Sequence, residues 1–142
     1  MKKLVMLMAL IPSLLHAECV VDGVSVVYEE VPAYRLQGRV AEADILHNKY
    51  VIRYGTDVKF FPKVLKDHIF AHECAHHRLK HTVLPRFYQS DKHEFDADCD
   101  AIKQLKWSET EVNELIDIWN KIYVHAQSNT RGNELKQCLL QN

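Results

Sequence analysis

The chain has 142 residues, of which 47% are hydrophobic and 26% are charged, and its formal net charge is −1. This length suits one domain rather than two, and the composition is that of an ordinary globular protein. Because 18 basic residues face 19 acidic ones, there is no positive excess to neutralise a phosphate backbone. Nucleic acid is therefore excluded as an expected partner.

The first 17 residues have the pattern of a secretory signal peptide. A basic start is followed by an apolar run from Leu4 to Leu15, and Ala17 supplies the small residue needed for cleavage. The run is too short, and too broken by Pro12, for a transmembrane helix. Removal of its two lysines leaves 16 basic residues against 19 acidic ones. We expect residues 18–142 to be exported, periplasmic or secreted, as a single domain without a stable membrane span.

Four cysteines remain after cleavage, and an even number in an exported chain predicts disulfides. Four cysteines allow three connectivities. The pairing that we favour joins Cys19 to Cys138, at the two ends of the mature chain, and Cys74 to Cys99 between two expected helices. The alternative is that Cys74 and Cys99 are small buried thiols.

The first part of the mature chain predicts a small antiparallel sheet. Val20 to Val27 is rich in valine, and Val40 to Leu46 alternates apolar with polar residues. A third segment, Lys49 to Tyr54, contains β-branched and aromatic residues and is closed by Gly55. His47-Asn48 lies between the last two segments and suits a tight turn.

From Pro62 onward the pattern is helical. Proline suits the first turn of a helix, and apolar residues and histidines recur at helical spacing as far as Leu79. This helix is expected to end before Pro85. Asp91 can cap the next helix, with Glu94 at its third position as in a capping box.

Two further helices complete the expected order of elements. Ser108 and Glu111 form another capping box, and a short last helix is expected from about Gly132 to Leu140. Strands followed by helices predict an α+β domain, in which a small antiparallel sheet precedes a helical core. The aromatic residues expected in its core are Phe60, Phe61, Trp107 and Trp119.

The first helix carries the sequence His72-Glu73-Cys74-Ala75-His76. Two histidines four residues apart lie on one face of a helix, so both imidazoles can bind one metal ion. The glutamate between them stands where a general base is needed. This is the HExxH pattern of zinc peptidases, and the alternative is that these are ordinary helix residues.

Two neighbouring histidine pairs have the same spacing but lack the glutamate. His68 with His72 is one of them, and His77 with His81 is the other. Without the glutamate neither pair makes the full motif. We expect His77 and His81 to lie on a solvated face.

A catalytic zinc ion needs a third protein ligand and an open position. The metzincin pattern would require a histidine at position 82, where this chain has Thr82. The expected ligand is instead Glu94, on the next helix. Asp98, one turn further on, is expected to accept the outer N–H of a ligand histidine and so to fix its tautomer. The alternative third ligands are His93, Asp96 and Asp98 itself.

HExxH followed by Glu94-Phe95-Asp96-Ala97-Asp98 resembles the gluzincin arrangement, and most of all the HtpX-like and CAAX-prenyl-protease-like zinc peptidases. That family also carries a later histidine and arginine. His125 and Arg131 stand at that spacing here, with Ala126 where the family usually has proline. The resemblance implies a zincin-like helical core that holds one Zn²⁺, with His72, His76 and Glu94 as its ligands. It implies that Glu73 is the catalytic base. It also implies that His125 and Arg131 help to form the catalytic site. For His125 and Arg131 the alternative is a solvated helix end and linker.

The resemblance implies an exported zinc metalloendopeptidase that hydrolyses peptide bonds through a zinc-activated water. Its peptide or protein substrate would bind as an extended strand, and Lys49 to Tyr54 is the expected sheet edge for it. The alternative from another class is a non-catalytic, zinc-containing periplasmic module that binds polypeptide. A third reading, an amidase acting on cell-wall peptides, shares its zinc chemistry with the first.

Overall fold

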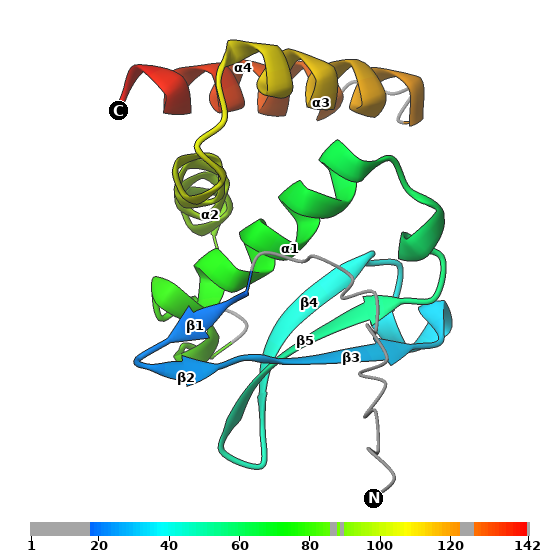
Figure 1. Cartoon of the computed structure of the whole chain (residues 1–142), viewed down its shortest axis with the longest axis vertical. Helices are drawn as coiled ribbons and strands as arrows, with labels where there is room; N and C mark the ends of the chain where they lie inside the picture. The colour runs from blue at the N-terminus through cyan, green and yellow to red at the C-terminus, as the bar shows by residue number, and fades with distance from the viewer. Residues whose placement is uncertain (1–17, 86–87, 89, 123–126, 142) are drawn as a thin grey trace, which may run out of the picture.

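The computed structural model describes residues 18–85, 88, 90–122 and 127–141. In this part of the chain two short sheets come first and four helices follow, which is the α+β order that the sequence predicts (Figure 1). The predicted signal peptide lies outside the described residues. Among those residues, no helix is both long and apolar enough to span a bilayer.

The chain begins with a small hairpin. Strand β1 (Val20–Val21) pairs antiparallel with β2 (Val24–Ser25). Asp22 and Gly23, at the turn, both have positive φ angles, 53° and 77°, as tight hairpin turns require. The prediction of one strand from Val20 to Val27 is therefore wrong, because the Asp-Gly turn reverses the chain in its middle.

A three-stranded sheet follows, formed by β3 (Val27–Val31), β4 (Ala41–Leu46) and β5 (Lys49–Gly55) in the order β3-β5-β4. The β4–β5 pair is the predicted antiparallel hairpin, and its turn residues have φ angles of 49° and 61°. However, β3 runs parallel to β5, so the prediction of an entirely antiparallel sheet is wrong. The crossover from β3 to β4 contains the 3-10 turn η1 (Ala33–Leu36), whose Leu36 is buried.

Strand β5 is the centre of this sheet. Both of its sides are paired, one with β3 and the other with β4. The prediction that Lys49 to Tyr54 forms a free edge is therefore wrong. The edge that faces the helical part is β4, which contacts the first long helix.

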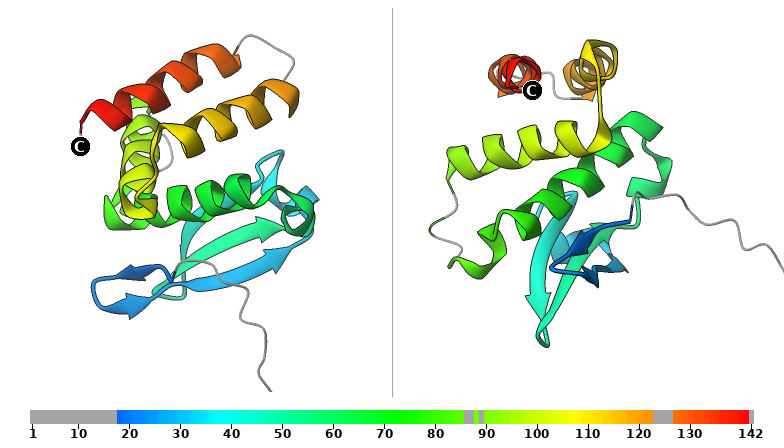
Figure 2. Two further views of the ribbon diagram at one scale, coloured as in Figure 1. Left: turned by 45° about the horizontal axis from the view of Figure 1, so that its top comes forward. Right: turned by 60° about the vertical axis from the view of Figure 1, so that its left-hand side comes forward.

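The helices are α1 (Lys63–Arg78), α2 (Asp91–Leu105), α3 (Glu109–Ile122) and α4 (Gln127–Leu140). Helix α1 packs on the sheet with one side and against α2 and α3 with the other. Helices α3 and α4 form an outer layer, and α2 crosses below it (Figure 2). As a result α1 lies between the sheet and the remaining helices.

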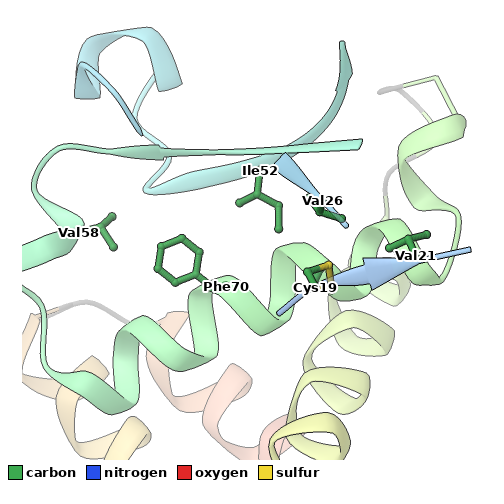
Figure 3. Close-up of a cluster of buried hydrophobic side chains, with 7 residues drawn as sticks. Cys19, Val21, Val26, Ile52, Val58 and Phe70 are labelled. Carbon is green, nitrogen blue, oxygen red and sulfur yellow. A yellow bond between two sulfur atoms is a disulfide. The ribbon is translucent and has the colours of Figure 1, made fainter. Parts of the chain in front are cut away.

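Each face of α1 has its own hydrophobic core. Between α1 and the sheet the buried side chains include Val21, Val26, Ile52, Val58 and Phe70 (Figure 3). Between the helices they include Leu65, Ile102, Val112, Leu115, Trp119 and Leu135.

Three of the four aromatic residues predicted to lie in the core contribute to it. Trp119 is buried, and Phe61 and Trp107 pack against the helical core. Phe60, at the end of the 3-10 turn η2 (Val58–Phe60), is 80% exposed, so its assignment to the core is wrong. Val58, within that turn, is buried, and Phe61, directly after it, is partly buried against the same core.

The helix ends differ from the predictions by a few residues. Ser90, not Asp91, caps α2, in a capping box with His93. One half of the predicted box before α3 is present, because the Ser108 N–H donates to Glu111 Oε2 at 2.8 Å. The Ser108 hydroxyl accepts from the Thr110 N–H at 3.3 Å, one residue before Glu111. Helix α4 begins before Gly132, which packs inside the helix against the Ile116 side chain, where a Cβ atom would lie 3.4 Å from Ile116 Cγ2.

All four cysteines form disulfides, as predicted, but the favoured pairing is wrong. The bonds join Cys19 to Cys74 and Cys99 to Cys138, with Cα atoms 5.8 and 4.9 Å apart. The reason is that β1 lies against α1, while α4 lies against α2. Two disulfides are typical of chains that fold in an oxidising compartment outside the cytoplasm.

Candidate metal centre

The centre begins with two histidines on the face of α1 that meets α2. His72 and His76 are one turn apart and both are buried, and their Nε2 atoms lie 3.0 Å from each other. The helical spacing of four residues brings both rings to the same place, as expected from the sequence.

Helix α2 adds Glu94 from its first turn. Glu94 Oε2 lies 3.2 Å from His72 Nε2, and Glu94 Oε1 lies 3.5 Å from His76 Nε2. Alanines at the contact between the helices are fully buried and allow a close approach. They are Ala75, Ala97 and Ala101. The Glu94 side chain remains 48% exposed, so the centre opens to solvent on this side.

Asp98 lies behind His72 and is itself buried. Its Oδ1 accepts a hydrogen bond of 2.7 Å from His72 Nδ1. Arg131, on α4, donates to both carboxylate oxygens, from Nε to Oδ2 and from Nη2 to Oδ1, each at 3.0 Å. Although burial would raise the pKa of Asp98, the charge and hydrogen bonding of His72 and His68 hold it well below its usual value.

The resemblance implies that Arg131 helps to form the catalytic site. In the structure Arg131 is hydrogen-bonded to Asp98, which is in turn hydrogen-bonded to the candidate ligand His72. Its guanidinium is held by Asp98 and lies over the Trp119 ring, 4.8 Å from the ring centroid. The nearby charges of Glu94 and Glu73 also raise its pKa, against the effect of burial. His125, the other residue implied by the resemblance, lies outside the described residues.

Within the part of the chain that the structure describes, two groups of side chains could hold a metal ion. One is His72, His76 and Glu94, and the other is His68, His72 and Asp98. The first group opens to solvent through Glu94. In the second group Asp98 already carries the positive guanidinium of Arg131, which would repel a cation. The first group is therefore the better cation site.

The charges around the first group favour a cation. Burial alone would lower the pKa of His72, but Asp98 and Glu94 raise it to about 10. Burial and the neighbouring His72 lower the pKa of His76 to about 3. The hydrogen bond to His72 lowers the pKa of Glu94 to about 2. In the metal-free protein His72 thus holds a proton at the point where a cation would bind.

Glu73 lies on α1 beside the sheet edge. Burial raises the pKa of its carboxyl, and the charge of His72 opposes the increase. The charge of Glu94 adds to the increase, and a hydrogen-bonding interaction with the Ala43 backbone, on β4, opposes it. Glu73 is therefore close to both the cation site and the edge strand. An elevated pKa suits a carboxylate that must take up a proton near neutral pH.

The residues that could have replaced Glu94 have other partners. His93 belongs to the capping box of α2, and Asp96 pairs with Lys92 one turn before it. Asp98 is occupied by His72 and Arg131. Of the four candidates named from the sequence, Glu94 is the one that approaches the Nε2 atoms of both His72 and His76.

His77 and His81 are buried, so the prediction that they form a solvated face is wrong. His77 Nε2 donates to the Val51 carbonyl of β5 at 3.0 Å, and its Nδ1 accepts from the Thr82 hydroxyl at 3.1 Å. His81 lies in η3 (His81–Val83), and its Nδ1 is 3.0 Å from His76 Nδ1. The signal in the sequence was the near match of His81 to the metzincin position, one residue away.

His68 is also buried, and the sequence suggested no role for it. Its Nε2 lies 3.2 Å from Asp98 Oδ1. The ring lies beside two tryptophans, with centroid distances of 6.1 Å to Trp107 and 5.5 Å to Trp119. Burial lowers the pKa of His68, and the hydrogen bonding and charge of Asp98 oppose this decrease.

Comparisons of the chain with protein-family models, with curated proteins and with solved structures found no match.

Proposed function

We propose that the protein is an exported zinc-dependent peptidase. The observation that carries the proposal is the convergence of three donor atoms, His72 Nε2, His76 Nε2 and a Glu94 carboxylate oxygen. Glu73 is close enough for the charges of His72 and Glu94 to act on its carboxyl. Two histidines and a carboxylate are a common ligand set of catalytic zinc, which leaves a fourth position for water or substrate. The two disulfides support export to the periplasm or out of the cell.

The spacing of the donors supports zinc. Ligand bonds of 2.0–2.1 Å at tetrahedral angles would separate two donor atoms by about 3.3 Å. The three separations here are 3.0, 3.2 and 3.5 Å. The outer hydrogen bond from His72 Nδ1 to Asp98 leaves the Nε2 lone pair free for a metal once the second proton has left.

When bound, zinc would supply Lewis acidity, which lowers the pKa of water and polarises a carbonyl. Glu73 would accept the proton of the attacking water and pass it to the leaving amine. The elevated pKa of Glu73 makes it a stronger base than an exposed glutamate. Arg131 would act through Asp98 and His72 rather than on the substrate, because both of its hydrogen bonds go to Asp98.

The substrate would bind as an extended strand along β4. This strand is the outer one on its side of the sheet, and among the described residues no other strand pairs with that side. Its Ala43 backbone interacts with Glu73, so a peptide lying along it would pass the general base. Backbone pairing of this kind binds polypeptides without requiring a particular sequence.

The test is cleavage of a mixed peptide library, which includes short cell-wall peptides, by the zinc-loaded protein without residues 1–17. The control is Glu73→Gln, which keeps the size of the side chain and removes the base. Peptides cut by the wild type and left intact by a zinc-loaded Glu73→Gln variant are the expected result, read by mass spectrometry. Equal cleavage by both proteins would rule out Glu73 as the base.

The β4 edge also suits a second candidate, a zinc-containing module that binds polypeptide without cutting it. The same experiment separates the two functions. Peptides that are retained by the wild type and recovered intact would support the binding module.

A further inference from the structure

We propose that His81 is a positioning residue for the metal ligand His76, holding the ring in the tautomer that a metal requires. This inference rests on the proposed metal site formed by His72, His76 and Glu94. It adds a residue that lies outside both HExxH and the segment from Glu94 to Asp98.

The orientation of the His76 ring determines which of its nitrogens faces the cation site. Its Nε2 points into the cation site, 3.0 Å from His72 Nε2 and 3.5 Å from Glu94 Oε1. To bind a metal, Nε2 must be unprotonated and offer its lone pair. A neutral imidazole then carries its single proton on Nδ1. That proton needs an acceptor, because the ring is buried.

Among the described residues, the side-chain atom within hydrogen-bonding distance of His76 Nδ1 is His81 Nδ1, at 3.0 Å. His76 therefore donates and His81 accepts, which places the proton of a neutral His81 on its Nε2. His81 is 5% exposed, so water does not compete freely for this contact. One hydrogen bond thus determines the tautomers of both rings.

His81 is itself held by the structure on both sides. Lys80, with a φ angle of 62°, follows the end of α1 and directly precedes η3. On the other side the His81 ring packs on His93, with centroids 4.4 Å apart. His93 Nδ1 accepts from the Ser90 N–H at 3.3 Å, and His93 directly precedes Glu94. His81 thus lies between the helix that provides His76 and the turn that provides Glu94.

The two ligand histidines have unlike partners as a consequence. His72 donates to a carboxylate, Asp98, whereas His76 donates to a neutral ring. Outer partners of ligand histidines typically change metal affinity about 10- to 100-fold when they are removed. We expect His81 to contribute within that range.

The test compares His81→Leu with His81→Asn, two substitutions of nearly equal size. Asparagine can place its Oδ1 near the position of His81 Nδ1 and accept the hydrogen bond, whereas leucine cannot. Zinc affinity is measured by competition with a chromophoric chelator, and thermal unfolding checks that both variants fold. We expect zinc binding about 10- to 100-fold weaker in His81→Leu, and close to wild type in His81→Asn. Equal affinity in all three proteins, or an equal loss in both variants, would overturn the proposal.

Nitrogen-15 NMR of the histidines provides a second readout that packing alone would not change. In the zinc-loaded wild type we expect a proton on His76 Nδ1 and none on His81 Nδ1, and the opposite pattern would overturn the proposal. If the wild type binds zinc and His81→Leu binds it with the same affinity, His81 has no positioning role and the proposed function stands. A wild type that binds no zinc would remove both.

Discussion

Arg131 binds Asp98 through two parallel hydrogen bonds of 3.0 Å, one to each carboxylate oxygen. Asp98 Oδ1 in turn accepts from His72 Nδ1, so helix α4 is linked to a candidate metal ligand on α1 through α2. A bidentate pair fixes the orientation of a carboxylate as well as its charge. The last helix is therefore part of the support of the metal centre.

Replacement of Asp98 by asparagine should weaken zinc binding about 10- to 100-fold, because the variant loses the charge that holds the Nδ1 proton of His72. Chelator competition measures the affinity. The matched control is Asp96→Asn on the same helix, whose carboxylate pairs with Lys92 instead. A comparable loss in the control would show that the effect is not specific to Asp98.

Arg131→Gln tests whether the arginine acts through Asp98 or on the substrate. If it acts through Asp98, the zinc dissociation constant should rise roughly tenfold, while kcat at saturating zinc stays near the wild-type value. The peptide is one that the wild type cleaves. A large drop in kcat with unchanged zinc affinity would instead support direct action on the reacting carbonyl.

The Cys99–Cys138 disulfide joins α2 to α4, the helix that carries Arg131. Its sequence separation is 39 residues, and a loop of this length corresponds to about 4 kcal/mol of stability in the chain-entropy description. Replacement of both cysteines by serine should lower the free energy of unfolding by about that amount, as measured in urea.

The same pair of substitutions should also weaken zinc binding, because α4 then holds Arg131 less firmly. In this background Arg131→Gln should cause a smaller further loss of affinity than it does in the wild type, since both changes act on the same contact. Fully additive losses would mean that the disulfide and Arg131 act separately.

The stability of the metal-free protein should fall on both sides of neutral pH. His72 has a pKa raised to about 10, so its contribution is complete below its ordinary value near 6.5 and is lost as the pH rises towards 10. Glu94 has a pKa lowered to about 2, so its contribution is present above 4.5 and is lost as the pH falls towards 2. Urea unfolding midpoints at a series of pH values measure both effects.

Zinc should change the alkaline part of this profile. Since zinc would take the place of the Nε2 proton of His72, its affinity should increase with pH from about 7 to 10. Calorimetry in buffers of different ionisation enthalpy would detect the released proton. If zinc binding released no proton at pH 7, the prediction that His72 is protonated in the metal-free protein would be wrong.

Pairing of the substrate with β4 can be tested on the substrate. Methylation of the backbone nitrogens of a cleaved peptide, one at a time, removes one donor in each variant. If the peptide adds a strand, cleavage should be sensitive at every second position, because successive N–H groups of a strand point to opposite sides. Uniform sensitivity along the peptide would argue against strand addition.

Much of the candidate site could be predicted because helical spacing is a local property. A helix through HExxH places His72 and His76 on one face whatever surrounds it, and the same holds for Glu94 and Asp98 on α2. The β4–β5 hairpin was also predictable, from two strands and a tight turn that are adjacent in the sequence.

Other features depend on how distant segments meet, and the sequence does not contain that information locally. The disulfide pairing follows from β1 lying on α1 and α4 lying on α2. The parallel pairing of β3 with β5 depends on a crossover of the chain. His81 reaches His76 only because α1 ends at Arg78 and Lys80 adopts a left-handed conformation.

The order of the two disulfides along the chain affects how the protein can mature. Cys19 pairs with Cys74 before Cys99 and Cys138 follow, so the two covalent loops are consecutive and do not overlap. Cysteines that are oxidised in the order in which they leave a translocation channel would form the native pairs directly. The yield of native protein should therefore be the same in an exporting host with or without disulfide isomerase activity, and a dependence on the isomerase would contradict this order of oxidation.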